Sequence, residues 1–277
     1  MENQSKGHLI IIGGAEDKTG ENVILKQANE MLSDNDILTI ITTATEKPQE
    51  VGENYKKVFT KMGVKNIQIL DINTRDNANS PKTCELIKKS KGIFMTGGDQ
   101  LRITSILGGT AAYEELKQVY YHGGVIMGTS AGASVMSSTM VVQGEDNEPA
   151  KKCTLKMAPG FRLLENSIID QHFDQRGRLG RLLCGVAENP EILGIGIDED
   201  TAIKVYPDNH FEIIGTNTVT ILDGTSIKSS NVSELAPNEM LAIIGVTVHT
   251  LPKNYGFNLT TREVIRLKTG GQKNGSN

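Results

Sequence analysis

The sequence predicts an α/β protein with a mostly parallel sheet flanked by helices and additional antiparallel β structure in its C-terminal part. From Leu9 to about Leu183, short β-branched runs alternate with longer amphipathic stretches, which is typical of a parallel sheet covered by helices. These short runs are almost continuously apolar, as strands buried on both faces should be. After Gly194 the segments are mainly strand-like and are separated by turn signals such as Pro207–Asn209.

The first part of the chain supplies the predicted parallel strands and the helices between them. The strands are Leu9–Ile12, Ile37–Thr42, Ile67–Ile72, Gly92–Thr96, Val125–Met127 and Ser167–Gln171. The helices, which repeat apolar residues at helical spacing, are Asn22–Leu32, Gln49–Met62, Pro81–Ser90, Leu101–Leu107 and Ala111–Tyr121.

The C-terminal part predicts antiparallel β structure packed against the same core. Its strands are Ile195–Ile197, Ala202–Tyr206, Phe211–Ile214, Thr218–Leu222 and Met240–Thr250. Gly144–Lys156 is polar and indicates a loop, and Lys268–Asn277 is too polar and glycine-rich to order itself. Since no repeat or long linker interrupts the chain, we expect one hydrolytic domain over residues 7–267 and a flexible tail over 268–277.

Composition and charge exclude several classes of protein. The 29 basic and 33 acidic residues are spread along the chain and give a net charge of -4, which argues against a nucleic-acid partner. The apolar run Leu9–Ile12 is too short for a signal-peptide core or a membrane span, so we expect a cytoplasmic protein with no membrane partner. The widely spaced Cys84, Cys153 and Cys184 predict neither a disulfide framework nor a zinc site.

The sharpest local motif is Gly128–Gly132 (GTSAG), which follows a buried strand and precedes a helix-compatible run, Ala131–Met140. A G-x-S-x-G turn between strand and helix holds its serine out of the sheet as a nucleophile, here Ser130. The N–H of Ala131 then points toward the oxygen that becomes negative during acyl transfer. A glycine-rich helix start with Ser130 as its N-cap would give the same pattern.

A second glycine turn, Gly97–Gln100, follows another predicted strand. Loops at the carboxyl ends of strands line the ligand crevice in open α/β sheets, so this turn can face Ser130. An N–H of Gly98 or its neighbour would be the second donor to the oxyanion. An ordinary tight turn remains the alternative.

A serine nucleophile needs a base, and His172 is the best placed histidine. It closes a predicted strand and lies in a polar cluster that runs from Asp170 to Arg181, whereas the other histidines fit structural or solvated positions. The turn after the strand Gly194–Ile197 offers three carboxylates that could orient the base: Asp198, Glu199 and Asp200. The residues alone do not choose among them, and Asp170 or Asp174 could also serve.

Arginines beside His172 indicate a substrate that carries carboxylates. Arg178 and Arg181 are three residues apart and share a helix face, and Arg176 precedes them. Guanidinium groups hold carboxylates through paired, planar hydrogen bonds. A solvated helix face is the alternative.

Taken together and in this order, these motifs closely resemble those of the cyanophycinase family. They are Gly97–Gln100, Gly128–Gly132, Asp170–Phe173 with Arg176, Arg178 and Arg181, and Gly196–Glu199. The resemblance covers most of residues 7–267, and the cluster from Asp170 to Leu182 is its most specific part. It implies a serine peptidase with a fold like that of class I glutamine amidotransferases, acting as a homodimer. Its substrate would be cyanophycin, multi-L-arginyl-poly-L-aspartate, in which arginine is attached to each β-carboxyl, and its products would be β-Asp-Arg dipeptides.

The resemblance also implies a role for each matching residue. Ser130 is the nucleophile, His172 the base and Glu199 the acid that orients it. The substrate pocket comprises Gln100, Asp170, Gln171, Arg176, Arg178 and Arg181. Neither a metal nor an organic cofactor is needed for acyl transfer from Ser130 with the oxyanion on N–H groups near Gly98 and Ala131.

Three other functions fit parts of the sequence. An α-aspartyl dipeptidase would share the serine turn and would prefer short Asp-X peptides to a branched polymer. A nucleotide-binding module is suggested by Ile10–Gly14, but no G-x-G-x-x-G completes the motif, and Glu16 and Asp17 would repel phosphate. A non-catalytic relative that only binds the polymer is disfavoured by the presence of Ser130 and His172.

Overall fold

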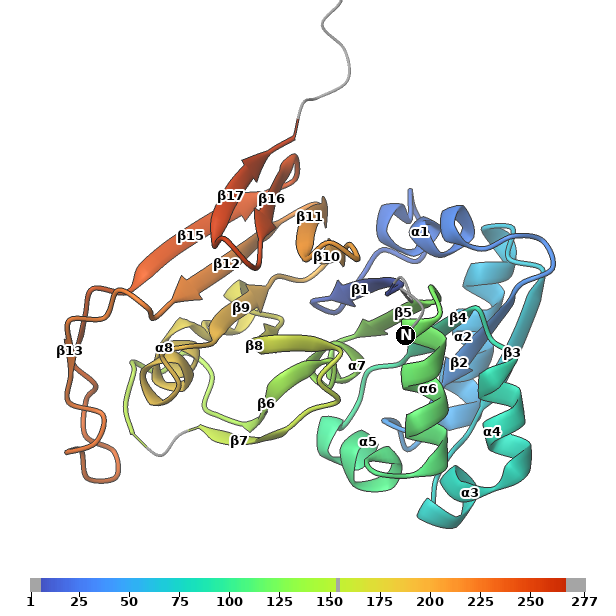
Figure 1. Ribbon diagram of the computed structural model, residues 1–277, viewed down its shortest axis with the longest axis horizontal. Coiled ribbons are helices and arrows are strands. Elements are labelled where there is room, and N and C mark those ends of the chain that lie inside the picture. The colour runs from blue at the N-terminus through green and yellow to red at the C-terminus, as the bar shows by residue number, and fades with distance from the viewer. Residues whose placement is uncertain (1–5, 153–154, 268–277) are drawn as a thin grey trace, which may run out of the picture.

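The computed structural model describes residues 6–152 and 155–267 of the 277-residue chain, so the predicted tail 268–277 lies outside the described residues. Five of the six predicted parallel strands form the parallel half of a nine-stranded sheet, in the order β1-β5-β4-β2-β3 (Figure 1). They are β1 (His8–Ile12), β2 (Ile37–Ile41), β3 (Asn66–Leu70), β4 (Gly92–Met95) and β5 (Val125–Thr129). Because the strands are parallel, the loops that follow β1, β4 and β5 meet at one edge of the sheet.

Helices cover both faces of this parallel half. α1 (Val23–Met31) and α2 (Pro48–Lys61) bury Leu25 and Phe59 against one face, where Ile10 and Phe94 point. The helices on the other face are α3 (Arg75–Asn79), α4 (Pro81–Lys88), α5 (Gln100–Leu107) and α6 (Ala111–Tyr121). These pairings confirm the predicted parallel sheet with helices on its two sides.

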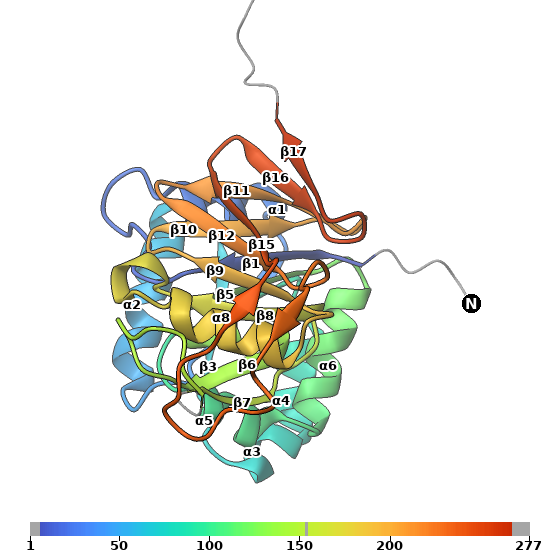
Figure 2. The ribbon, with the colours of Figure 1, turned by 90° about the vertical axis from the view of Figure 1, so that its left-hand side faces the viewer.

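The large sheet continues beyond β1 in antiparallel fashion. β10 (Thr201–Val205) pairs with β1, and β11 (His210–Gly215), β16 (Tyr255–Asn258) and β17 (Glu263–Arg266) follow outward from it (Figure 2). The C-terminal strands therefore extend the same sheet, as the change of sequence texture after Gly194 predicts.

A second, six-stranded sheet packs beside the first. Its order is β15-β12-β9-β8-β6-β7, and β6, β8 and β9 are parallel to one another. The strands are β6 (Ser137–Gln143), β7 (Lys156–Pro159), β8 (Leu164–Gln171), β9 (Leu193–Ile197), β12 (Thr218–Asp223) and β15 (Thr247–Pro252). α8 (Leu179–Glu188) covers this sheet through Leu182 and Val186. A short ladder of β13 (Ser229–Ser230) and β14 (Ile243–Ile244) projects from the molecule (Figure 1).

Three predictions of secondary structure were wrong in detail. The predicted strand Ser167–Gln171 is part of β8 and belongs to the second sheet, because its β-branched residues report burial but not which sheet they join. The helix-compatible run Ala131–Met140 is one helical turn, α7 (Ala131–Ser134), followed by β6. The predicted strand Met240–Thr250 is interrupted at Gly245, whose φ of 93° is unfavourable in a strand.

The predicted loop Gly144–Lys156 contains no helix in its described part and ends where β7 begins.

Within the described ranges 6–152 and 155–267, none of the helices has the length and apolar character that a bilayer crossing needs.

Candidate active site

Ser130 lies on a sharp turn between β5 and α7. Its φ of 52° and ψ of -112° are strained for a residue with a side chain, and its N–H donates to the carbonyl of Ile12 over 3.0 Å. Both flanking glycines are needed for space. A Cβ atom at Gly128 would lie 2.3 Å from the carbonyl oxygen of Gly132, and one at Gly132 would lie 2.3 Å from that of Met95. The predicted strand–turn–helix context of the serine is therefore present.

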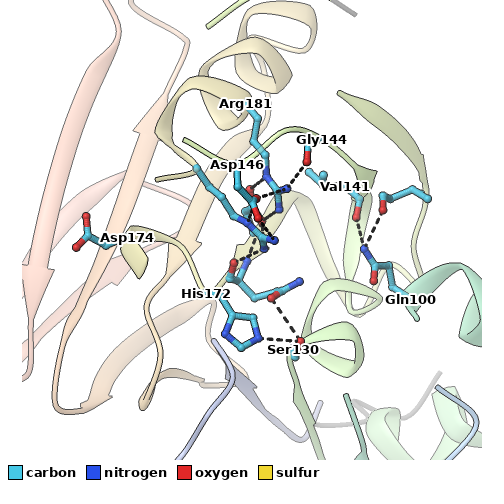
Figure 3. Close-up of polar contacts among 12 residues, drawn as sticks. Gln100, Ser130, Val141, Gly144, Asp146, His172, Asp174 and Arg181 are labelled. Carbon is cyan, nitrogen blue, oxygen red and sulfur yellow. Dashed lines mark hydrogen bonds and ion pairs between the residues drawn. The ribbon is translucent and has the colours of Figure 1, made fainter. Parts of the chain in front are cut away.

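His172 reaches Ser130 from the end of β8 in the other sheet. Its Nε2 lies 3.1 Å from Oγ of Ser130 (Figure 3). The backbone of His172 is held at a φ of 47°, and its N–H donates to the carbonyl of Gly13 over 2.8 Å. The imidazole occupies space that only glycine leaves free, because a Cβ atom at Gly14 would lie 2.3 Å from Cε1 of His172.

Glu199 is the carboxylate that contacts the imidazole. Its Oε1 lies 2.6 Å from Nδ1 of His172. Since a carboxylate only accepts hydrogen bonds, Nδ1 carries the hydrogen and Nε2 is left to accept the proton of Ser130. Burial lowers the pKa of His172 from its ordinary value, the hydrogen bond to Glu199 opposes that effect, and the charge of Arg176 adds to it. The imidazole is thus neutral at pH 7, as a general base must be.

The other carboxylates considered from the sequence have structural partners. Asp198 is buried and accepts from the N–H and hydroxyl of Thr218 and from the N–H of Asp174. Asp200 accepts from the N–H of Asp17 and from the hydroxyl of Thr216. The side chain of Asp174 points away from His172 (Figure 3). Among the three carboxylates of this turn, Glu199 is therefore the one in hydrogen-bond contact with His172.

The turn after β4 comes close to the nucleophile. A Cβ atom at Gly97 would lie 3.3 Å from Cβ of Ser130, so a larger residue would require one of the two turns to shift by a few tenths of an ångström. At Gly98 the φ of 142° and a distance of 2.1 Å from a Cβ atom to the carbonyl oxygen of Ala44 require glycine. Asp99 then caps α5 by accepting from the N–H groups of Leu101 and Arg102. The cap fixes the turn beside Ser130 and Ala131.

Arg178 and Arg181 form a buried ion-pair cluster. Their side chains are 6% exposed, and Arg181 holds both oxygens of Asp170, with Nε donating to Oδ2 over 2.6 Å. Arg178 donates from Nη1 to the carbonyl of Gln171 over 2.6 Å and from Nε to Oδ1 of Asp146 over 2.7 Å. Arg181 also reaches Asp146, over 3.2 Å (Figure 3). The charged groups of the two arginines and of Asp170 therefore already have partners within the protein.

The remaining predicted pocket residues differ in burial, since Gln171 is buried and Gln100 is half-buried. Oε1 of Gln171 accepts from the Ser130 hydroxyl over 3.4 Å, which is longer than the contact to His172. Gln100 donates from its amide to the carbonyls of Val141 and Val142 and so braces α5 against β6. Arg176 is exposed, unlike the other two arginines of the cluster.

Sequence reasoning missed two residues that support the site. Asp146 supplies a second negative charge to the two buried arginines. The sequence contained a signal for such a residue, because two buried arginines need more than the single carboxylate of Asp170. Oε1 of Gln175 accepts from the backbone N–H of Glu199 over 2.9 Å and so fixes the orienting acid. No local pattern indicates the second contact, which joins segments 24 residues apart.

No group of three or more His, Cys, Asp or Glu side chains in residues 6–152 and 155–267 is arranged to hold a metal ion.

A mixed α/β fold with serine, histidine and glutamate side chains in line is that of a serine hydrolase. The model of peptidase family S51 matches the chain over residues 9–214. The chain therefore belongs to peptidase family S51.

The individual proteins to which this chain is similar have cyanophycinase or peptidase names. The chain is 36% identical over 265 residues to the cyanophycinase of Geminocystis herdmanii (strain PCC 6308), which covers 95% of this chain and 97% of the relative. A solved peptidase from an acI-B1 Actinobacterium superposes with a TM-score of 0.66 at 20% identity, over 92% of this chain and 98% of its own. A putative peptidase E protein from Listeria monocytogenes EGD-e gives a TM-score of 0.51 at 18% identity, over 76% and 97%. The two structural likenesses show the fold alone.

Proposed function

We propose that this serine peptidase degrades cyanophycin through an acyl-enzyme on Ser130 and releases β-Asp-Arg dipeptides. The observation that carries the proposal is the line of hydrogen bonds from Ser130 Oγ to His172 Nε2, 3.1 Å, and from His172 Nδ1 to Glu199 Oε1, 2.6 Å. The cyanophycinase of Geminocystis herdmanii, with 36% identity over nearly the whole chain, supports the choice of substrate.

The proposed reaction is acyl transfer in two stages. His172 takes the hydroxyl proton as Ser130 Oγ attacks a carbonyl carbon of the poly-aspartate backbone, and the oxyanion accepts from N–H groups of Gly98 and Ala131. The C–N bond breaks as His172 returns the proton to the leaving amine. Water, deprotonated by His172, then hydrolyses the ester on Ser130 and restores the hydroxyl. Glu199 keeps the hydrogen on Nδ1 throughout.

The substrate-binding roles divide according to the contacts that each side chain already makes within the protein. We assign direct contact with the substrate to Arg176, which is exposed beside His172, to Gln171, which is buried but lies beside the Ser130 hydroxyl, and to Gln100. Asp170, Arg178 and Arg181 act instead as positioning residues, because their charged groups are buried and paired with one another and with Asp146. The hydrogen bond from Arg178 to the carbonyl of Gln171 supports this assignment, since it holds the residue that precedes His172.

Several broader properties belong to the same proposal. We infer a class I glutamine amidotransferase-like fold for the parallel half, a single domain over residues 7–267, a homodimer, and an exopeptidase that works in the cytoplasm. The parallel order β1-β5-β4-β2-β3 with the nucleophile after β5 supports the fold assignment. Size-exclusion chromatography with light scattering tests the homodimer, which a mass near 30.0 kDa would contradict.

Incubation of the protein and its Ser130→Ala variant with cyanophycin, followed by mass spectrometry, tests the function. We expect β-Asp-Arg from the native protein and none from the variant. Cleavage of α-aspartyl dipeptides without release of β-Asp-Arg would instead establish the aspartyl dipeptidase alternative.

A further inference from the structure

A pocket of about 300 Å³ lies beside the proposed nucleophile, on the side of the turn that follows β4. Its lining residues are Lys18, Val51, Asn54, Tyr55 and Gly97. Val51 and Tyr55 are one turn apart on α2 and present an apolar wall, and Lys18 supplies a cation from the loop after β1. None of these side chains has a role in the proposed acyl transfer.

The pocket shares a wall with the catalytic turn. Gly97 lines it, and the same residue packs against Ser130, since a Cβ atom there would lie 3.3 Å from Cβ and 3.8 Å from Oγ of Ser130. Gly98, a proposed oxyanion donor, is the next residue. A substrate whose carbonyl oxygen lies at Gly98 can therefore extend a side branch into the pocket.

A buried carboxylate links the wall of the pocket to the turn that carries Ser130. Glu16 is 3% exposed, and its Oε1 accepts from the hydroxyl of Tyr55 over 2.6 Å. Its other oxygen accepts from the hydroxyl of Thr129, which directly precedes Ser130. Nζ of Lys18 lies 3.1 Å from Oε1 of Glu16. The ammonium group of Lys18 is thus anchored in the pocket by a group that also holds the catalytic turn.

The charge and stacking of Lys18 decide which chemical group the pocket can accept. One of its three ammonium hydrogens faces Glu16, and the side chain is 39% exposed, so the other donors remain accessible from the pocket. The same ammonium lies 4.9 Å from the centroid of the Tyr55 ring and occupies the aromatic face that a guanidinium group would use. The pair of Lys18 and Glu16 carries little net charge, but Glu16 is 3% exposed and both of its oxygens already accept hydrogen bonds. The ammonium of Lys18 is therefore the charged group that the pair presents to the pocket, and its remaining donors suit a carboxylate.

We propose that this pocket is a subsite for the free α-carboxylate of a β-linked arginine, with the Lys18 ammonium as its ligand. The inference rests on the proposed function, because the arginine branches of cyanophycin are joined through their α-amines and therefore end in both a guanidinium and an α-carboxylate. The pocket takes the carboxylate, and the guanidinium stays outside. Lys18 then determines specificity by binding the arginine branch and not the poly-aspartate backbone.

A pair of synthetic substrates isolates this contact. Short poly-aspartate peptides carry either β-linked arginine or β-linked agmatine, which has the same guanidinium chain without the carboxylate. We expect the native protein to cleave the arginine peptide with a kcat/KM roughly tenfold higher, as for a partly exposed charge-assisted hydrogen bond. In Lys18→Met the ratio of the two kcat/KM values falls to about one. In Lys18→Arg, which retains the cation, it stays near the native ratio.

The matched control is Lys61→Met, which removes an exposed lysine at the end of α2 and preserves the native ratio. The ratio compares two substrates on one enzyme, so a partly unfolded variant does not change it. Cleavage of both peptides with the same ratio in native protein and Lys18→Met would overturn the subsite and leave the proposed function intact. Cleavage of neither peptide by the native protein would overturn the proposed function itself.

Discussion

At the scale of single residues, small side chains shape the site as much as charged ones do. Gly14 leaves room for the His172 ring, and Gly97 lets the turn after β4 approach Ser130. Ser130 and His172 both have positive φ angles, 52° and 47°, which these contacts hold in place. The strained backbone presents the hydroxyl and the imidazole to each other across two sheets.

Gly14→Ala should remove activity by displacing His172. The new Cβ would lie 2.3 Å from Cε1 of the ring, and a misplacement of about 1 Å costs on the order of a hundredfold in rate. Gly109→Ala is the matched control, because Gly109 also has a positive φ, 68°, but no atom lies within 4 Å of its Cβ position. Thermal unfolding should show a destabilisation of about 1 kcal/mol in Gly109→Ala, from the backbone conformation alone, and a larger one in Gly14→Ala, which adds the clash. Steady-state kinetics should show lost activity only in Gly14→Ala. Equal activity in the two variants would contradict the packing role of Gly14.

The pH dependence of kcat/KM should report His172. Only the neutral imidazole accepts the serine proton, and burial lowers the pKa of His172 below its ordinary value of 6.5. We therefore expect kcat/KM to rise with pH and to reach half its plateau below pH 6.5. Because the pKa of His172 is lower in the folded protein than in the unfolded chain, this residue contributes to the free energy of unfolding above pH 6.5. That contribution is lost as the pH falls through the lowered pKa.

Glu199→Gln should shift this acid limb to lower pH and reduce the plateau by roughly ten-thousandfold. The direction follows because the carboxylate of Glu199 raises the pKa of His172, and its loss leaves burial and Arg176 to lower that pKa further. The loss of rate follows because an amide no longer selects the tautomer with hydrogen on Nδ1. A pH–rate profile on a synthetic substrate measures both quantities. An acid limb that moves to higher pH would rule out Glu199 as the partner of His172.

At the scale of elements, the loop between β6 and β7 is part of the site, although the sequence predicts only a polar connection there. Asp146 in this loop binds Arg178 and Arg181 of the segment that follows His172, and its carboxylate has a lowered pKa. Burial acts against that shift, and the hydrogen bond and charge of Arg178 produce it. The loop thereby fixes the position of α8 relative to the end of β8.

Asp146→Asn should lower kcat/KM by about tenfold to a hundredfold and destabilise the protein by about 1–3 kcal/mol. The stability loss is below that for a fully buried pair because the Asp146 side chain is 37% exposed. Most of the kinetic change should appear in kcat, since the buried cluster positions Gln171 and His172. Glu145→Gln is the control, because Glu145 on the same loop pairs with Lys151 and not with the arginines. Asp146→Glu should recover part of the rate, and an effect on KM alone would show direct substrate contact instead.

The limits of sequence-based prediction are also clearest at this scale. The strands β1 to β5 and their helices, except the short α3, could be predicted, because continuous apolar runs and amphipathic periods are local properties. The second sheet could not, since nothing in Ser167–Gln171 distinguishes a strand of one buried sheet from a strand of another. For the site, residue type and context were enough to propose Ser130 and His172, which lie in contact in the structure. The proposal of Glu199 needed either the family resemblance or the fold, because Asp198 and Asp200 differ from it only in their distant partners.

At the scale of the whole molecule, the site exists only where the two sheets meet. Ser130 follows β5 of the large sheet, His172 ends β8 of the second sheet, and Glu199 lies on the turn by which the chain passes from β9 to β10, from one sheet to the other. Thr216 and Thr218 hold this turn through the carboxylates of Asp200 and Asp198. Neither sheet alone carries a complete set of catalytic groups.

The proposed single domain should therefore lose activity and structure in one transition. The hydrophobic core supports this, because one buried cluster joins Leu9 and Ile126 of the large sheet to Ile169 and Ile195 of the second. Urea unfolding followed by far-UV circular dichroism and by activity should give coincident curves with one midpoint. If the sheets were separate domains, a first transition would abolish activity while part of the ellipticity remained. That result would contradict the proposed domain, because one sheet would then unfold, and the three proposed catalytic side chains separate, while the other sheet stayed folded.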